Sequence, residues 1–262
     1  MKCKICDSES KHVKTLTVRN THQAEYYLCQ SCGFMFIDNP TWLTEAYEAP
    51  INITDTGYVM RNVYLSRKTL ILCSLIFGTD KTYLDYGGGY GMLTRLMRDY
   101  GLNFLWDDIY TKNLFAQGFE YKKEQNTPIE LLSTFECFEH LPNPKEEIDK
   151  MFSITKNIFF STVLLPKETP PASDWEYYGL NHGQHVAFYS KESLSYIAKQ
   201  HGVHFYTDGK NIHLFSNKNF PQWLFKLLMF STKFELDLFL KKIFLKTKTY
   251  SDNQELKRRG II

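Results

Sequence analysis

The chain has 262 residues, of which 43% are hydrophobic and 23% are charged, so it is long enough for one large folded domain and a small appendage. Its net charge of +2 gives no general argument for binding nucleic acid. No run reaches the roughly 18 apolar residues that span a bilayer, and Met1 leads directly into Cys3, so we expect no signal peptide and a cytoplasmic protein.

Two pairs of cysteines near the N-terminus have the spacing of a metal site. They are Cys3 and Cys6, then Cys29 and Cys32. Paired C-x2-C knuckles bring four thiolates to one tetrahedral centre, which is the geometry that Zn²⁺ prefers, and a site with four protein ligands has a structural role. With β-prone residues at 13–18 and 25–28, the pattern predicts a zinc ribbon over residues 1–38. Free thiols and a redox pair are the alternatives.

Residues 39–78 are predicted to connect the ribbon to the next domain, with an apolar helix toward their end. A polar cluster around Tyr58 and Arg61 precedes that helix. The cluster either folds as a lid over the site that follows or forms a surface loop with a helix cap at Thr54 or Asp55.

A strand, a glycine-rich turn and a helix follow in succession. Residues 82–84 are a short β-prone run that ends at Asp85, and apolar residues then recur at helical spacing up to Gly101. The turn between them contains Gly87, Gly88, Gly89 and Gly91. Glycine lets the backbone approach a ligand, and a helix N-terminus offers free N–H groups, so the arrangement is typical of a nucleotide site. An ordinary tight turn is the alternative.

The spacing of the glycines discriminates between kinds of nucleotide site. It departs from the dinucleotide fingerprint, and no Gly-Lys-Ser/Thr follows as it does in a P-loop. The run Asp-x-Gly-x-Gly-x-Gly from Asp85 to Gly91 resembles motif I of the class I S-adenosylmethionine (SAM) methyltransferases. The resemblance implies that SAM is the cofactor, in contact with Asp85 and with the four glycines.

The second strand of this domain is expected at residues 103–106 and ends in two acids, Asp107 and Asp108. A carboxylate at this place can accept both hydroxyls of a ribose, and only one of two successive side chains faces the cofactor. We choose Asp108, because the segment resembles that of the sugar-type methyltransferases. A helix N-cap at Asp108 is the alternative.

Further strands and helices alternate up to residue 216. Strands are expected at residues 129–135, 157–165, 203–206 and 211–215, and helices from Asn143 to about Lys156 and from Ser190 to Gln200. The fold class is therefore α/β, with a methyltransferase domain over residues 79–216. The resemblance implies a Rossmann-like sheet of seven strands in the order 3-2-1-4-5-7-6, with strand 7 antiparallel.

Two histidine segments resemble signatures of the sugar-type branch, whose C-methyltransferases share a four-cysteine zinc module. The first is Glu136-x-x-Glu139-His140, after the strand whose end lies under the transferable methyl group. The resemblance implies cofactor contacts from Phe135 and Glu136. It also implies that His140 lines the substrate pocket together with His185 of the second segment, which covers residues 174–190.

The second segment departs from the family at Gln184, where the branch has a glutamate. Glutamine cannot take up a proton, although it can hold a hydroxyl group. A neutral histidine titrates in the range that a base needs. We therefore expect His185 to be the base, with His140 as the second candidate and Gln184 beside them. The alternative is that either imidazole has only a structural role, such as holding a loop in place.

Residues 217–262 form a basic tail, with ten Lys and Arg against four Asp and Glu. Apolar residues recur at helical spacing over residues 220–245, which predicts amphipathic helices. These helices either lie on an anionic membrane surface or pack on the core or on a second subunit. The end of the tail, from Lys257 to Arg259, is expected to be disordered.

Together these features predict a SAM-dependent methyltransferase whose acceptor is a sugar, either a nucleotide-sugar or a glycan precursor of the bacterial cell surface. SAM is expected as the cofactor and Zn²⁺ as a structural ion. The alternatives are a methyltransferase-like binding module without turnover, and a methyltransferase for another small molecule, RNA or protein. We expect a cytoplasmic protein that contacts no nucleic acid, with peripheral contact at the inner membrane face as an option for its tail.

Overall fold

The structure is a computed structural model that describes residues 1–47 and 55–260. The candidate helix cap Thr54 lies outside the described residues. The chain forms two compact units. The first contains residues 1–47, Phe135–Lys156 and Phe160–Asn219, and the second contains residues 55–134, Asn157–Phe159 and 220–260.

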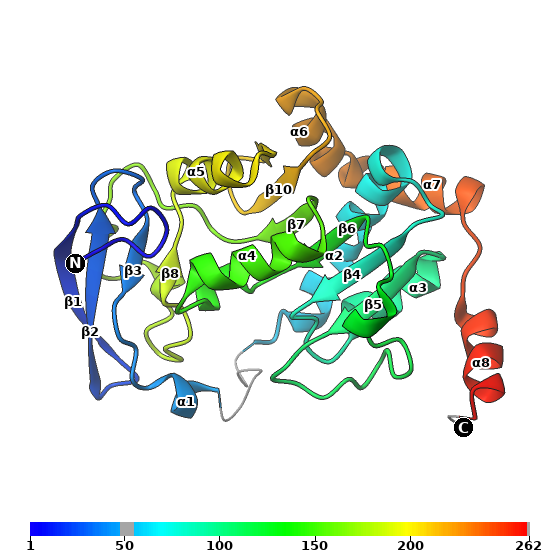
Figure 1. The fold of residues 1–262 in the computed structure, drawn as a ribbon, viewed down its shortest axis with the longest axis horizontal. Helices are drawn as coiled ribbons and strands as arrows, with labels where there is room; N and C mark the ends of the chain where they lie inside the picture. The colour runs from blue at the N-terminus through cyan, green and yellow to red at the C-terminus, as the bar shows by residue number, and fades with distance from the viewer. Residues whose placement is uncertain (48–54, 261–262) are drawn as a thin grey trace. The chain divides into compact units, whose positions relative to one another are not determined.

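The first unit contains a sheet of four short strands in the order β1-β2-β3-β8 (Figure 1). The strands are β1 (Ser10–Val18), β2 (His22–Cys29), β3 (Met35–Ile37) and β8 (Ala187–Phe188). The two strands predicted from sequence lie within β1 and β2. The sequence did not predict that β8 joins this sheet, where Met35 pairs with Phe188. The segment that carries His185 is thus fixed directly to the N-terminal sheet.

Aromatic side chains fill the core beneath this sheet. Tyr26 of β2 packs edge-on against Tyr178 with ring centroids 5.0 Å apart, and both contact Phe188. Trp42 is buried there and donates its indole N–H to the carbonyl of Gly183 at 2.7 Å. These contacts hold the loop before β8 in one position relative to the N-terminal strands.

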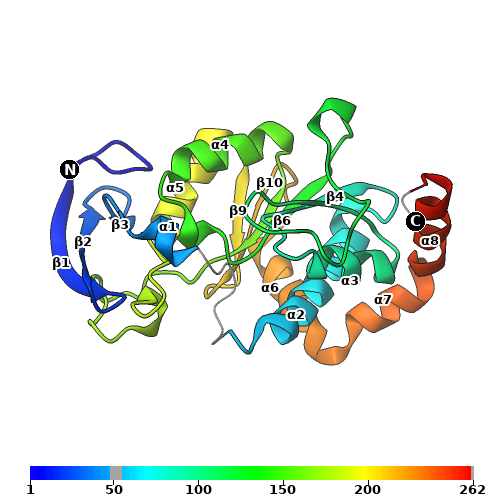
Figure 2. The ribbon, with the colours of Figure 1, turned by 90° about the horizontal axis from the view of Figure 1, so that it is seen from below.

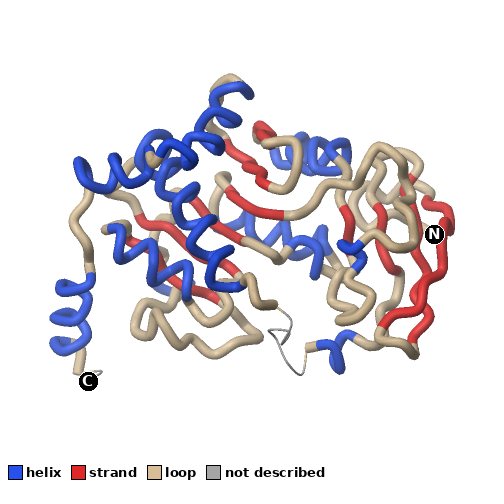
Figure 3. Tube along the Cα trace, turned by 180° about the vertical axis from the view of Figure 1, so that it is seen from behind, coloured by secondary structure: helices blue, strands red, loops and turns tan. Residues whose placement is uncertain are grey.

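The second sheet has six strands in the order β5-β4-β6-β7-β10-β9. The strands are β4 (Thr82–Tyr86), β5 (Asn103–Asp107), β6 (Leu131–Thr134), β7 (Ile158–Ser161), β9 (His204–Thr207) and β10 (Ile212–Ser216). Strand β4 runs parallel to both β5 and β6, and β9 and β10 form an antiparallel pair. The α/β prediction is confirmed by this mixed sheet and by the helices between its strands, although in the described chain only a short 3-10 turn at Lys123–Gln125 lies between β5 and β6 (Figure 3).

Strand 3 of the seven predicted strands is not formed in the described part of the chain, so the order 3-2-1-4-5-7-6 needs a correction at its outer edge. In place of strand 3 there is a single parallel bridge between Trp106 and Glu120. Trp106 N–H donates to the carbonyl of Phe119 at 2.9 Å, and Tyr121 N–H donates to the carbonyl of Trp106 at 2.8 Å. Residues 122–127, which follow, are all polar, so a longer strand here would have no apolar side chains to bury.

The described part of the second unit has five α-helices, of which α2 is the longest. They are α2 (Tyr58–Leu72), which continues into a π-helical turn (Cys73–Phe77), α3 (Met92–Tyr100), α6 (Gln222–Phe230), α7 (Leu236–Phe244) and α8 (Thr249–Arg258). Helix α2 contacts α3, α6 and α7 (Figure 2). Among the described residues, no helix combines the length and the apolarity that crossing a membrane requires.

The last helix, α8, corrects the prediction of a disordered end. Arg98 of α3 is 2% exposed and forms a bidentate pair with Asp252 of α8, at 2.8 and 2.7 Å. The Arg98 guanidinium also donates to the carbonyl of Phe104 and lies over the ring of Phe119. A buried arginine needs such a partner, and the sequence pattern gave no sign of a contact over more than 150 residues.

The described part of the first unit has three α-helices, of which the first was not predicted and the other two begin near their predicted positions. They are α1 (Leu43–Ala46), α4 (Pro144–Ile154) and α5 (Lys191–His201), with short 3-10 turns at Phe138–His140 and Glu176–Tyr178. The predicted cap at Ser190 is confirmed, because its Oγ accepts from Ser193 N–H at 3.0 Å. Asn143 makes no side-chain cap bond, and Pro144 starts α4 instead.

Candidate functional site

The glycine turn of the second unit leaves no room for side chains. Gly87, Gly89 and Gly91 have φ angles of 66°, 54° and 85°, a region that favours glycine. A Cβ atom on Gly88 would lie 2.8 Å from Asp85 Oδ2 and 2.8 Å from Trp106 Cδ1. The turn is therefore packed directly against the ends of β4 and β5.

Asp85 is buried beneath this turn, at 2% exposure. Its carboxylate accepts from the hydroxyl of Thr94 in α3 at 2.9 Å and from that of Ser133 in β6 at 3.4 Å. Burial raises its pKa to about 7, while the two hydroxyl donors act in the opposite direction. In this conformation Asp85 ties β4, β6 and α3 together and supports the turn from below.

Asp108 supports the turn from the side. Its Oδ2 accepts from Gly89 N–H at 2.9 Å, and its Oδ1 accepts from the N–H groups of Tyr110 and Thr111 at 2.7 and 2.8 Å. A carboxylate has about four acceptor positions, so three are used and one remains. The residues after Asp108 form a turn and not a helix, so Asp108 caps the backbone N–H groups of a loop. Binding both ribose hydroxyls requires that these backbone bonds rearrange.

Two tyrosines stand next to the glycines. The Tyr58 hydroxyl lies 3.2 Å from the position of a Cβ on Gly89, and its ring is 6.5 Å from that of Tyr90. Burial raises the pKa of Tyr58. Tyr58 is the first residue of α2, while Arg61 forms a bidentate pair with Asp55 at 3.1 and 2.7 Å. Tyr90 was missed, although an aromatic residue between two glycines of a binding turn was visible in the sequence.

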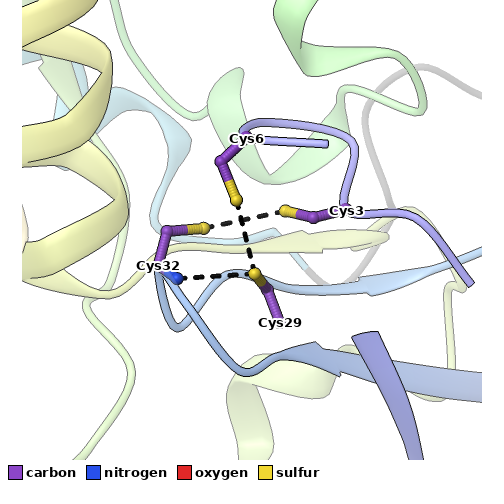
Figure 4. Close-up of side chains that lie close together, drawn as sticks. All are labelled: Cys3, Cys6, Cys29 and Cys32. Carbon is purple, nitrogen blue, oxygen red and sulfur yellow. Dashed lines mark hydrogen bonds between the residues drawn. The ribbon is translucent and has the colours of Figure 1, made fainter. Parts of the chain in front are cut away.

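The four cysteines of the first unit converge on one point (Figure 4). Their sulfurs lie within 4.8 Å of one another, with Cys3 and Cys32 at 3.6 Å and Cys6 and Cys29 at 3.4 Å. A tetrahedral zinc site with bonds of about 2.3 Å has edges of about 3.8 Å. Backbone N–H groups of Ser31 and Cys32 point at the Cys29 sulfur. The arrangement fits four-coordinate Zn²⁺ with no position left for a substrate.

His140 and His185 also lie together in the first unit, with ring centroids 5.0 Å apart. His140 Nδ1 donates to the carbonyl of Gln184 at 3.1 Å, and His185 Nδ1 donates to that of Tyr177 at 2.6 Å. Burial, and then the nearby His140, hold the pKa of His185 well below its usual range. His185 is thus neutral at physiological pH and has its Nδ1–H committed to the backbone.

Gln184, between these residues, has a packing role. Its side chain is 7% exposed, and the amide nitrogen donates to the carbonyl of Ala46 at 2.8 Å. Its backbone N–H donates to His182 Nδ1 at 3.1 Å. The residue therefore links the loop before β8 to α1.

Glu139, which belongs to the first histidine segment, lies in the same cluster as the two histidines. It is 1% exposed, and within the described part of the chain neither carboxylate oxygen has a hydrogen-bond partner of normal geometry. One ligand atom each from Glu139, His140 and His185 lie within 4.8 Å of one another. Burial, and then the nearby Glu136, raise the pKa of Glu139 to about 8, although the hydroxyls of Tyr177 and Thr162 are close enough to oppose this.

Phe135 and Glu136, expected to contact the cofactor, begin this same segment. Phe135 is half-buried and Glu136 is exposed. Glu136 has a φ of 52°, which is unusual for a residue with a side chain, and its carboxylate accepts from the Ser161 hydroxyl at 2.7 Å. The structure thus gathers Asp85, the glycines and Asp108 in the second unit, and Phe135, Glu136 and the histidines in the first.

Comparison with known protein families places this chain in one of them. Residues 60–205, more than half of the chain, match a family described as a methyltransferase domain. A search of the curated proteins finds no match. Among solved structures, CalO1, a methyltransferase in calicheamicin biosynthesis in its SAH-bound form, has 14% identity and a TM-score of 0.43, over 67% of this chain and 61% of that chain.

Two further solved structures have sequence identities and TM-scores to this chain close to those of CalO1. An O-methyltransferase family protein from Burkholderia thailandensis has 13% identity and a TM-score of 0.44, over 70% of this chain and 69% of that one. Human N-acetylserotonin methyltransferase in complex with SAM has 13% identity and a TM-score of 0.41, over 68% and 66%. The chain spans less than two thirds of the CalO1 chain, and likeness at this level carries no argument about a substrate.

Proposed function

We propose, from the premise that this chain belongs to the methyltransferase domain family, that it transfers a methyl group from SAM to a small-molecule acceptor. The observation that carries the proposal is the glycine turn. Gly88 is packed against Asp85 and Trp106, and the Gly89 N–H is bound by Asp108. Such a turn presents bare backbone to a ligand at the N-terminus of α3, which an ordinary surface turn does not need.

The cofactor supplies an electrophilic methyl group when it is bound, and the residues of this chain position the partners. We propose cofactor contacts from the glycine turn, Asp85, Asp108, Phe135 and Glu136. The acceptor oxygen or carbon attacks the methyl carbon, the C–S electron pair stays on sulfur, and the acceptor loses one proton. Most of the rate of such a step comes from orientation. We assign proton uptake from the acceptor to His185, with His140 as the second candidate, and Gln184 holds the loop that carries His185.

A sugar is the acceptor class that we propose, as a nucleotide-sugar or a precursor of a cell-surface glycan. The support is the resemblance of the two histidine segments and of the four-cysteine module to the sugar-type branch. The near-neutral net charge of the chain speaks against a nucleic acid acceptor.

Calorimetry with SAM tests the cofactor proposal. We expect wild-type protein to bind one SAM and Asp108→Ala to bind at least tenfold more weakly, because Asp108 supports the turn even before it meets a ribose. Asp80→Ala is the matched control, since its side chain is 78% exposed. Absence of SAM binding in the wild type would remove the proposal. A screen of nucleotide-sugars for a mass increase of one methyl group then tests the acceptor class.

A structural Zn²⁺ at the four cysteines is part of the proposal, and Cys3, Cys6, Cys29 and Cys32 would hold it. Its role is to fix the N-terminal loop against β2 and β3, because a four-thiolate site is closed to substrate. Metal analysis should give one zinc per chain that is lost in Cys29→Ser.

The tail gives a specific reason to propose contact with an anionic membrane surface at the cytoplasmic side. Trp223, Phe234 and Phe239 are 65%, 74% and 60% exposed. The opposite faces of α6 and α7, with Phe225, Met229 and Leu240, are buried. Helices that pack on one face and expose large apolar groups beside lysines on the other are typical of membrane-surface contact.

A further inference from the structure

Three side chains of the first unit have the chemistry of a metal site that is distinct from the four cysteines. Glu139 and His140 are adjacent on a 3-10 turn after β6, and His185 directly precedes Val186 and β8. One carboxylate oxygen and two imidazole nitrogens lie within 4.8 Å of one another. Ligand bonds of about 2.1 Å place such atoms about 3.3 Å apart, so side-chain movements on the order of 1 Å would close the site.

A backbone carbonyl fixes the tautomer of each imidazole. Each Nδ1 donates its proton to a carbonyl oxygen, of Gln184 for His140 and of Tyr177 for His185. A neutral ring with a proton on Nδ1 has its lone pair on Nε2. Metal-binding histidines commonly donate their other N–H to a backbone carbonyl, which fixes the tautomer and the ring orientation.

Glu139 provides an independent reason to expect a cation. Its side chain is fully buried, and neither oxygen has a partner of normal hydrogen-bond geometry among the described residues. Buried polar groups are almost always satisfied, and an ion is one of the few explanations for a native exception. Glu139, which carries both oxygens, directly precedes His140 in the chain.

We propose that Glu139, His140 and His185 bind one divalent transition-metal ion, of the zinc, cobalt or iron(II) class, and leave coordination positions open. Two imidazoles and one carboxylate form the ligand set of catalytic zinc sites and of non-haem iron sites. Nitrogen ligands disfavour Ca²⁺ and Mg²⁺, which prefer oxygen. The same unit would thus hold two metals of different kinds, one closed in four thiolates and one open to a ligand.

The ion would also deepen the function proposed above, on which this step rests. An acceptor hydroxyl bound to it loses its proton to water more readily, so the oxygen is a better nucleophile toward the methyl carbon. His140 and His185 would then act as ligands. Proton uptake by His185 without a metal is the alternative that the experiment decides.

The test uses the full chain loaded with one Zn²⁺ per chain, which fills the four cysteines, and then titrated with Co²⁺. We expect one further equivalent to bind, with weak d–d absorption and no sulfur-to-cobalt charge-transfer band. Glu139→Gln and His185→Asn should keep their zinc and bind this Co²⁺ at least tenfold more weakly. His204→Asn removes an exposed histidine on β9 and should bind as the wild type does.

Absence of saturable Co²⁺ binding in the wild type would overturn the proposal, and so would equal binding by wild type and Glu139→Gln. A charge-transfer band that appears with the second equivalent would also overturn it, because it places cobalt on thiolates. If Glu139→Gln does not fold, the wild type and His185→Asn decide. SAM calorimetry on the same samples separates this result from the proposed function, since either can fail while the other holds.

Discussion

Substitution of Gly88 by alanine tests whether the glycine turn is built for close packing. The added Cβ would lie 2.8 Å from Asp85 Oδ2 and from Trp106 Cδ1, where ordinary contact begins at 3.4 Å. Neither neighbour can easily move. Asp85 is held by the Thr94 hydroxyl at 2.9 Å, and the Trp106 indole N–H donates to the Gly89 carbonyl at 2.9 Å. The turn itself must therefore move outward by about 0.6 Å.

This displacement has two measurable effects. Overpacking of this kind costs about 1–3 kcal/mol, so the free energy of unfolding in urea should fall by that amount. The shift also strains the bond from Gly89 N–H to Asp108, so SAM affinity should fall by about 5- to 150-fold if the same energy is lost from the bound state. Gly57→Ala is the control, because its Cβ would meet nothing closer than 3.7 Å.

The measurements are urea unfolding and SAM calorimetry on wild type, Gly88→Ala and Gly57→Ala. If Gly88→Ala matches Gly57→Ala in both, the turn is more open than the structure describes, and the physical argument for a cofactor site fails.

Three further predictions concern other parts of the molecule. Asp252→Ala leaves the buried Arg98 without its carboxylate, so stability should fall by about 3–5 kcal/mol and the melting temperature by about 10 °C. In the same thermal scan, Glu255→Gln removes a partly exposed charge that pairs with Arg259, so it should change the melting temperature little. Burial raises the pKa of Asp85 to about 7, so its protonated form stabilises the fold below about pH 4, and this stabilisation is lost as the pH rises to 7. In urea titrations over this pH range, Asp85→Asn should lose roughly 4 kcal/mol less stability than the wild type. Parallel pH profiles of the two proteins would contradict the assignment. Wild-type protein should co-sediment with vesicles that contain phosphatidylglycerol, and replacing Phe234 and Phe239 by serine should abolish this binding. Vesicles of phosphatidylcholine alone should bind neither the wild type nor the double variant. Wild-type protein that remains in the supernatant with the phosphatidylglycerol vesicles would refute contact between the tail and a membrane.

Local patterns explain what could be predicted from the sequence. The strand before Asp85, the turn and α3 are neighbours along the chain, and their apolar spacing and glycines depend only on nearby residues. The two cysteine pairs were predictable for the same reason, because each C-x2-C knuckle is a local turn. The Ser190 cap also follows from adjacent residues.

Contacts over long distances explain what was missed. The pairing of β8 with β3 joins Met35 to Phe188, and two residues of strand give no periodicity to detect. Only Lys257–Arg259 was expected to be disordered, yet helix α8 extends to Arg258 and is held through Asp252, which pairs with the buried Arg98. Strand 3 was expected from the family resemblance, and the polar run after Glu120 reduces it to one bridge.

The departure from the sugar-type branch at Gln184 has a physical explanation in its contacts. A glutamate here could not donate to the Ala46 carbonyl, as the Gln184 amide does, and its charge would be buried against that oxygen. The carboxyl group beside His140 and His185 is that of Glu139, which belongs to the first histidine segment and contributes one oxygen to the cluster. The change at Gln184 therefore removes an acid from the second histidine segment, while the acid of the first segment stays beside the two histidines.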